Sequence, residues 1–201
     1  MSTTAAAESE AAPARHDLLR IGPTFGGVLP RGDLEPTFMA GLLADLPVTA
    51  VRGIELSAYG EVGWSPLRQQ DDVIIPGRGQ TQLVQNTQVF LGEAGLRASV
   101  RLSELFYAHA ALGLAIDVTR TELKAFSLPA EAQNDLAWGP GGGLGVLMSL
   151  GPGALLAEIR YRELTGDLGG FNDIGEPALG RGTLHVGYLF ALPAVPPTWR
   201  S

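Results

Sequence analysis

The stretch Phe106-Tyr-Ala-His-Ala-Ala-Leu-Gly-Leu-Ala-Ile-Asp-Val-Thr119 decides the fold class of this chain. Every even-numbered residue in it is apolar, whereas the odd-numbered residues include Tyr107, His109 and Asp117. Alternation with a period of two is typical of a β-strand whose two faces meet different surroundings. The stretch Val51–Ser65 alternates in the same way, so the pattern is not confined to one place in the chain.

Six more segments alternate less regularly, and together with the first two they predict eight strands. These six are Asp17–Leu29, Thr37–Leu46, Val89–Leu102, Leu136–Leu150, Ala154–Arg162 and Thr183–Leu192. Each has at least the roughly 9–11 residues that a tilted strand needs to cross a bilayer, and no stretch approaches the roughly 20 apolar residues of a membrane helix. Pro23 and Pro140 fall inside two of the segments and require a bulge or an unpaired stretch there.

The predicted connections alternate in length along the chain. Three are short, namely Pro47–Ala50, Ser103–Glu104 and Gly151–Gly153. The other four are longer, namely Pro30–Pro36, Pro66–Gln88, Glu122–Asp135 and Glu163–Gly182. Short turns at one rim and long loops at the other are typical of outer-membrane barrels, in which they are periplasmic and extracellular respectively. The sequence therefore predicts an all-β, eight-stranded antiparallel up-and-down transmembrane barrel.

Composition limits the remaining possibilities. Of the 201 residues 45% are hydrophobic and 17% are charged, cysteine is absent, and the net charge is -7, which argues against a nucleic-acid partner.

We expect a disordered leader over residues 1–16, a barrel over 17–192 and a tail over 193–201. The leader has no basic start followed by an apolar core, so we expect the export signal of the natural protein to have been removed or to lie upstream of this start.

The two faces of the strands indicate which side meets lipid. The interior of an eight-stranded barrel is only wide enough for side chains, so the bulky apolar face does not fit inside it. The other face combines charges with many glycines, which leave room for arginine and tyrosine in a crowded interior. We therefore expect an apolar exterior and a charged interior, in which the following residues neutralise one another: Arg20, Glu55, Glu61, Glu93, Arg97, Arg101, Asp117, Glu158, Arg160 and Arg162.

Aromatic residues on the apolar face gather toward both rims, as the interfacial girdles of membrane barrels do. Near the long loops these are Phe38, Trp64, Phe90, Trp138 and Tyr161, and near the short turns they are Phe106, Tyr188 and Phe190.

The closing strand Thr183-Leu-His-Val-Gly-Tyr-Leu-Phe190 resembles the aromatic-ended last strand of small outer-membrane barrels. Over residues 17–192 the chain is similar to that family, which includes the transmembrane domain of outer membrane protein A and the opacity-type adhesins. The resemblance implies a location in the outer membrane of a Gram-negative bacterium. It also implies two kinds of partner, the lipid of that membrane and the barrel-assembly machinery that recognises the last strand.

A structural or surface-interaction role without catalysis is the function that these features favour. His109 and His185 lie on the inward face at different heights, and the sequence offers them no convincing serine or carboxylate partner set, so we expect neither an enzyme nor a cofactor or metal site. The loop Pro66–Gln88 is the expected contact for an external partner. Two alternatives stay open, a narrow porin-like pore or transport accessory, and a soluble lipocalin-like ligand-binding barrel.

Overall fold

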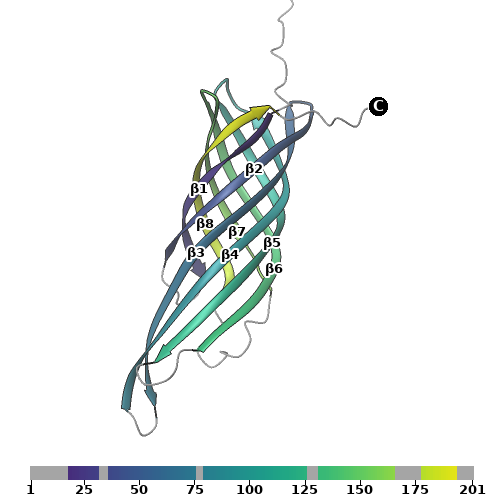
Figure 1. Ribbon diagram of the computed structural model, residues 1–201. Helices are drawn as coiled ribbons and strands as arrows, with labels where there is room; N and C mark the ends of the chain where they lie inside the picture. Colours follow the sequence, from purple (N-terminus) through teal and green to yellow (C-terminus); the bar gives the residue numbers. More distant parts are fainter. Residues whose placement is uncertain (1–17, 32–35, 76–78, 126–130, 166–177, 194–201) are drawn as a thin grey trace, which may run out of the picture.

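The computed structural model of the chain describes residues 18–31, 36–75, 79–125, 131–165 and 178–193. Eight antiparallel strands form a closed barrel in chain order, and β8 pairs with β1 (Figure 1). The strands are β1 (Leu18–Arg31), β2 (Thr37–Val51), β3 (Ile54–Ile75), β4 (Gly79–Arg101), β5 (Phe106–Ala125), β6 (Glu131–Leu150), β7 (Gly153–Arg162) and β8 (Ala178–Pro193). The predicted fold class and strand number are confirmed. Among the described residues no helix is long and apolar enough to cross a membrane.

The turns at one end of the barrel are short, and we call this the short-turn end. Arg52 and Gly53 connect β2 to β3 with φ angles of 51° and 82°, as a two-residue type I′ turn requires. The predicted turn at Pro47–Ala50 is therefore wrong, since β2 continues to Val51. A register shift between Pro47 and Thr49 inserts a bulge there, and a bulge is one of the places where a strand tolerates proline.

At the opposite end, the long-connection end, the strands run further than the sequence predicts. β3 and β4 stay paired from Pro66–Gln88 to Ile75–Gly79, so most of the predicted loop Pro66–Gln88 is a β-ribbon that extends beyond the barrel (Figure 1). β5 pairs with the base of this ribbon as far as Leu83–Ala125, and the described part beyond that pair is two-stranded. The predicted loops Glu122–Asp135 and Glu163–Gly182 are shortened in the same way by β5, β6 and β8. Apolar and charged residues alternate only where the two faces meet different media, so the pattern does not reveal the strand ends in this region.

Pro23 and Pro140, the two prolines that the sequence predicts inside strands, are accommodated without a bulge. Pro23 keeps its register opposite Leu42, while the pairing of β1 with β8 is interrupted at Gly22 and Pro23. Pro140 lies one residue beyond the β6–β7 pairs, and its carbonyl oxygen accepts a hydrogen bond from the backbone N–H of Glu163 at 3.0 Å. Each proline thus lies where one neighbouring strand does not need its missing donor.

Apolar side chains pack inside the barrel near both of its ends. Near the short turns the cluster consists of Leu43, Leu147, Ala154, Leu156 and Leu189. Toward the long connections there are two smaller clusters, Val28 with Met39 and Leu91, and Ala115 with Ala137 and Leu164. The polar interior lies between these ends.

Candidate functional site: a charged interior and an apolar exterior

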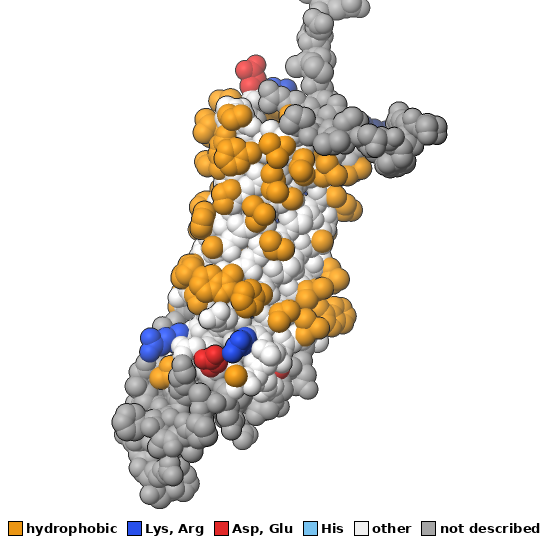
Figure 2. Space-filling model, viewed as in Figure 1, with side chains coloured by type: hydrophobic (Ala, Val, Ile, Leu, Met, Phe, Trp, Pro, Cys, Tyr) orange, Lys and Arg blue, Asp and Glu red, His pale blue; other side chains and the backbone are white. Residues whose placement is uncertain are grey.

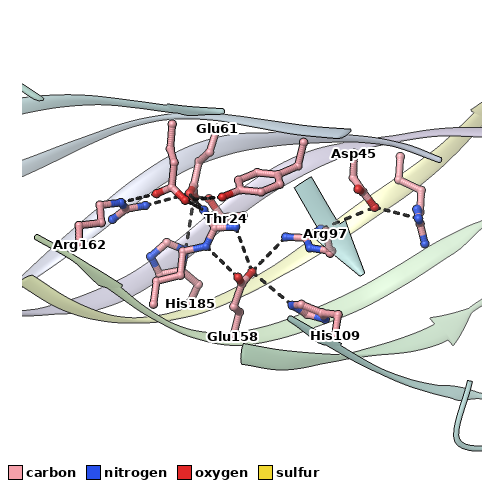
Figure 3. A network of polar contacts seen from close by, with 12 residues as sticks. Thr24, Asp45, Glu61, Arg97, His109, Glu158, Arg162 and His185 are labelled. Atoms are coloured by element: carbon pink, nitrogen blue, oxygen red, sulfur yellow. Dashed lines mark hydrogen bonds and ion pairs between the residues drawn. The ribbon is translucent and has the colours of Figure 1, made fainter. Parts of the chain in front are cut away.

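Arg160 occupies the centre of the polar interior. Its side chain is fully buried and bonds carboxylates from three strands: Nε donates to Glu158 at 2.8 Å, and Nη1 donates to Glu61 at 3.0 Å and to Glu93 at 2.9 Å. Figure 3 labels two of these carboxylates, Glu61 and Glu158, within the surrounding network. Glu61 lies on β3, Glu93 on β4, and both Arg160 and Glu158 on β7. Since β3 and β7 are on opposite walls of an eight-membered ring, this one guanidinium cross-links the barrel.

Two further arginines extend the network along the barrel. Arg162 donates to Glu61 at 3.1 Å and also to Glu93, while Arg97 donates to Glu158 at 3.1 Å. Three glutamates and three arginines thus face one another with no net charge. A buried charge is tolerated only when it is paired and hydrogen-bonded, and this arrangement meets that condition.

Tyr59 contacts the guanidinium groups of two of these arginines. Its ring centroid lies 4.7 Å from the Cζ atom of Arg160 and 5.3 Å from that of Arg97, within the range of a cation–π contact. Its hydroxyl donates to Glu93 at 2.6 Å. The ring therefore lies in the bore beside both arginines, and Gly113 provides the space for it, since a Cβ at Gly113 would lie 2.5 Å from the Tyr59 hydroxyl.

Each buried histidine has a carboxylate neighbour, which corrects the expectation that none is available. His185 Nδ1 lies 3.3 Å from Glu61 Oε1, and His109 Nε2 lies 3.5 Å from Glu158 Oε2. Thr24 also donates to Glu61, at 3.2 Å. These carboxylates already bind arginines, and both histidine side chains are fully buried, so the two pairs belong to the network.

Two outlying groups lie on either side of the central network. Toward the short turns, Arg20 pairs with Asp45 at 2.9 Å and also with Glu55. Toward the long connections, Asp117 pairs with Arg181. Arg101 does not join any of these groups. It is exposed near the short turns, and its Nε donates to the backbone carbonyl of Ser103 at 3.0 Å.

Sequence reasoning missed Arg181 and the position of Tyr59. Arg181 falls in a segment that the sequence assigns to a loop, because β8 begins at Ala178. Tyr59 follows the alternation of β3 between Ser57 and Glu61, which places it on the inward face, but the pattern alone does not show that it contacts arginines. Within the described part of the chain, no three histidine, aspartate or glutamate side chains converge in a way that would hold a metal ion.

The exterior carries large apolar side chains that no described residue covers. Among the most exposed are Leu112 at 75%, Leu144 at 68% and Ile159 at 66%. In Figure 2 apolar side chains cover this face in bands, and charged side chains appear only toward its two ends. An apolar area of this extent is unusual on a protein that meets water.

The aromatic residues expected at the rims all point outward. Phe38, Phe90, Trp138, Tyr161, Phe106 and Phe190 are exposed, while Trp64 and Tyr188 are half-buried. Phe38 packs edge-on against Trp64 with ring centroids 5.6 Å apart, and Tyr188 packs in the same way against Phe190 at 4.8 Å. Beyond the rim at the long-connection end, the exterior becomes polar at Arg68, Arg120 and Glu122.

The fold and the site define a small closed β-barrel with an ion-paired interior and an apolar exterior. No family model and no curated protein match the chain. Among solved structures it is similar to the attachment invasion locus protein Ail of Yersinia pestis, with 12% identity over 87% of this chain and 97% of that chain and a TM-score of 0.48. It is also similar to neisserial surface protein A, with 12% identity over 86% of this chain and 95% of that chain and a TM-score of 0.47.

Proposed function

We propose that this protein is a non-enzymatic β-barrel of the bacterial outer membrane with a structural or surface-interaction role. The observation that carries the proposal is the partition of its side chains, with apolar residues outward and ionised residues inward. Uncovered apolar surface costs about 25 cal/mol per Å² in water, and that cost disappears when acyl chains cover the surface. The outward aromatic residues at both rims then lie at the level of the lipid headgroups.

This partition is the reverse of that in a soluble carrier. A lipocalin-like barrel keeps an apolar cavity for its ligand and presents polar side chains to water. Here the interior between the apolar clusters is occupied by Glu61, Glu93, Glu158 and their arginine partners, whose side chains are at most 3% exposed. The same filled interior argues against a porin-like pore, because a conducting path needs continuous water through the bore.

A closed bore leaves the parts outside the lipid as the sites of interaction. The β3–β4 ribbon extends farther than any other described pair at the long-connection end, which we assign to the extracellular side (Figure 1). A rigid barrel that presents such a ribbon is suited to contact an external partner. At the other end, the outward Tyr188 and Phe190 of β8 are the residues we assign to recognition by the barrel-assembly machinery.

Shortening the ribbon tests the surface role. Gln69 pairs with Gln85, so residues 70–84 can be replaced by an Asn-Gly turn that joins this pair. We expect the shortened protein to fold in phospholipid vesicles with the β circular dichroism of a closed barrel, reduced only by the deleted strand residues, since the apolar belt is intact. Bacteria that express the full chain should adhere to immobilised matrix proteins, to heparin or to one another, and the shortened variant should lose that adhesion.

A control variant with Asn-Gly in place of Arg52-Gly53, at the opposite rim, should keep the adhesion. Equal adhesion of the full and shortened chains would contradict a role for the ribbon. Adhesion no greater than that of cells without the protein would contradict the surface-interaction role and leave the structural one.

A further inference from the structure

One edge of the β3–β4 ribbon is open. On the side of β3 that faces β2, strand pairing stops at Ala40–Trp64. Further along, Pro66 has no N–H to donate, and its carbonyl oxygen accepts a hydrogen bond from the Thr37 side chain at 2.6 Å. From Leu67 to Ile75 no strand in the described part of the chain pairs with this side of β3.

The contact with Thr37 shows which backbone groups of β3 point toward the open edge. The carbonyl of Pro66 points that way, and in an antiparallel strand the N–H and C=O groups of every second residue point to the same side. Since β3 keeps a regular register with β4 over this stretch, the backbone groups of Arg68, Gln70 and Asp72 also point to the open edge. An edge of this kind is a template for pairing with another chain.

The sequence of this edge is complementary to itself. An antiparallel partner of the same sequence meets the edge-pointing groups only when even-numbered residues lie opposite even-numbered residues. With Gln70 opposite Gln70 of a second copy, Arg68 lies opposite Asp72, and Leu67 lies opposite Val73. Opposite charges and apolar pairs at directly opposed positions stabilise antiparallel strands.

Other alignments of the two copies lack this complementarity. With the centre moved to Asp71, that aspartate lies opposite itself, and with the centre moved to Gln69, Leu67 lies opposite Asp71. Like charges directly opposed are destabilising. The charges therefore favour one register, and an unrelated apolar strand would leave them unpaired, so a second copy is the partner that the edge fits best.

The direction of β3 decides where that second copy lies. β3 runs from the short-turn end to the long-connection end, which is away from the membrane if the long connections are extracellular (Figure 1). Two copies in one membrane both send β3 outward, whereas antiparallel pairing requires strands that run in opposite directions. The pairing therefore joins copies in two facing membranes. Beside the edge the described wall of the barrel is low, since β1 ends at Arg31 and β2 begins at Thr37.

We propose that the ribbon binds the same ribbon of a second copy on another cell, through antiparallel pairing of the two β3 edges from Leu67 to Val73. The interface is isologous, with Gln70 on its two-fold axis and an Arg68–Asp72 pair on either side. This inference rests on the proposed surface role and names the partner, which is the chain itself.

Reversing the charges tests this register. In cells with Arg68→Asp, positions 68 and 72 are both acidic, and in cells with Asp72→Arg both are basic. Each variant alone should clump at least about tenfold less than cells with the unaltered chain, because like charges then oppose each other twice in every pairing. Both positions lie beyond the apolar belt, so both variants should fold, and circular dichroism in vesicles checks this.

Mixing the two variants restores the opposite charges. Cells with Arg68→Asp in one colour should form mixed clumps with cells that carry Asp72→Arg in a second colour, as readily as unaltered cells clump. The double variant Arg68→Asp/Asp72→Arg should clump with itself and exclude cells that carry the unaltered chain. Arg120→Asp, at an exposed position of β5 away from this edge, is the matched control and should leave clumping unchanged.

Single variants that clump as much as the unaltered chain, or the absence of mixed clumps, would overturn the proposal. Unaltered cells that adhere to matrix proteins or heparin but not to one another would also overturn it, while the surface-interaction role would stand. Unaltered cells that adhere to nothing would contradict that role itself, and the proposal with it.

Discussion

At the scale of single residues, Arg160 has the strongest effect on the interior. Four hydrogen bonds join its guanidinium to Glu61, Glu93 and Glu158, whose side chains are fully buried. A buried ion-pair network of this kind adds little net stability to the folded protein. Removing one member is nevertheless costly, because it leaves an uncompensated charge in a medium of low dielectric constant.

Arg160→Ala should therefore lower the free energy of unfolding by about 3–5 kcal/mol, since it leaves carboxylates buried without their common partner. Urea titration of the protein in phospholipid vesicles measures the change. The matched control is Arg120→Ala on the exterior, where the Arg120–Glu122 pair at 3.5 Å is largely exposed and its loss should cost less than about 1 kcal/mol. Similar small effects of both substitutions would contradict the cross-linking role of Arg160.

The sequence predicts the members of the interior better than their contacts. Alternation assigns a residue to a face, and this was enough to place Glu61, Glu93 and Arg160 together on the inward side. Which charges meet depends on how far each strand is displaced along its neighbour, and a strand pattern does not contain that displacement. For this reason the sequence predicts Arg101 as a member of the interior network, although the residue lies exposed at the rim.

At the scale of elements, the strands are well predicted where they cross the apolar belt and poorly predicted beyond it. β5 begins at Phe106 and β7 ends at Arg162, as the alternation indicates. The β3–β4 ribbon escapes detection because residues 69–72 and 80–82 are all glutamine, threonine or aspartate and show no apolar alternation in the sequence. A strand outside the lipid has no reason to alternate. The Arg52-Gly53 turn was missed for a different reason, namely that a proline five residues earlier gave a stronger turn signal.

Charge on the outward face of β5 tests the assignment of that face to lipid. Leu112 is 75% exposed and lies near the middle of the belt, between Leu96 and Gly142. Leu112→Arg should cost about 2–4 kcal/mol in vesicles, whereas an arginine close to an interface costs about 0–1 kcal/mol. Leu102→Arg, just after β4 at the short-turn rim, is the matched control, and urea titration again gives both values. Equal costs at the two depths would contradict burial of this face in a bilayer.

At the scale of the whole molecule, the network joins opposite walls and closes the bore. The full protein should show no discrete conductance steps in planar bilayers. The double variant Tyr59→Ala/Arg160→Ala removes the ring and the guanidinium that fill the middle of the barrel and should produce steps. Discrete conductance steps with the unaltered chain would instead favour a pore. If the double variant showed no conductance steps, side chains other than Tyr59 and Arg160 would have to close the bore.

The central claim is that one face of every strand meets acyl chains and the other meets the interior. A nitroxide scan along residues 110–116 of β5 in phospholipid bilayers measures this most directly, since each position can carry the only cysteine in the chain. Gly113 is left out of the scan, because a side chain there would collide with Tyr59. Oxygen, which concentrates in the acyl region, should relax the even-numbered sites such as Leu112 and Leu114 most strongly and the odd-numbered sites least. A scan without a period of two, or one in which a water-soluble nickel complex relaxes the even-numbered sites most strongly, would contradict the account.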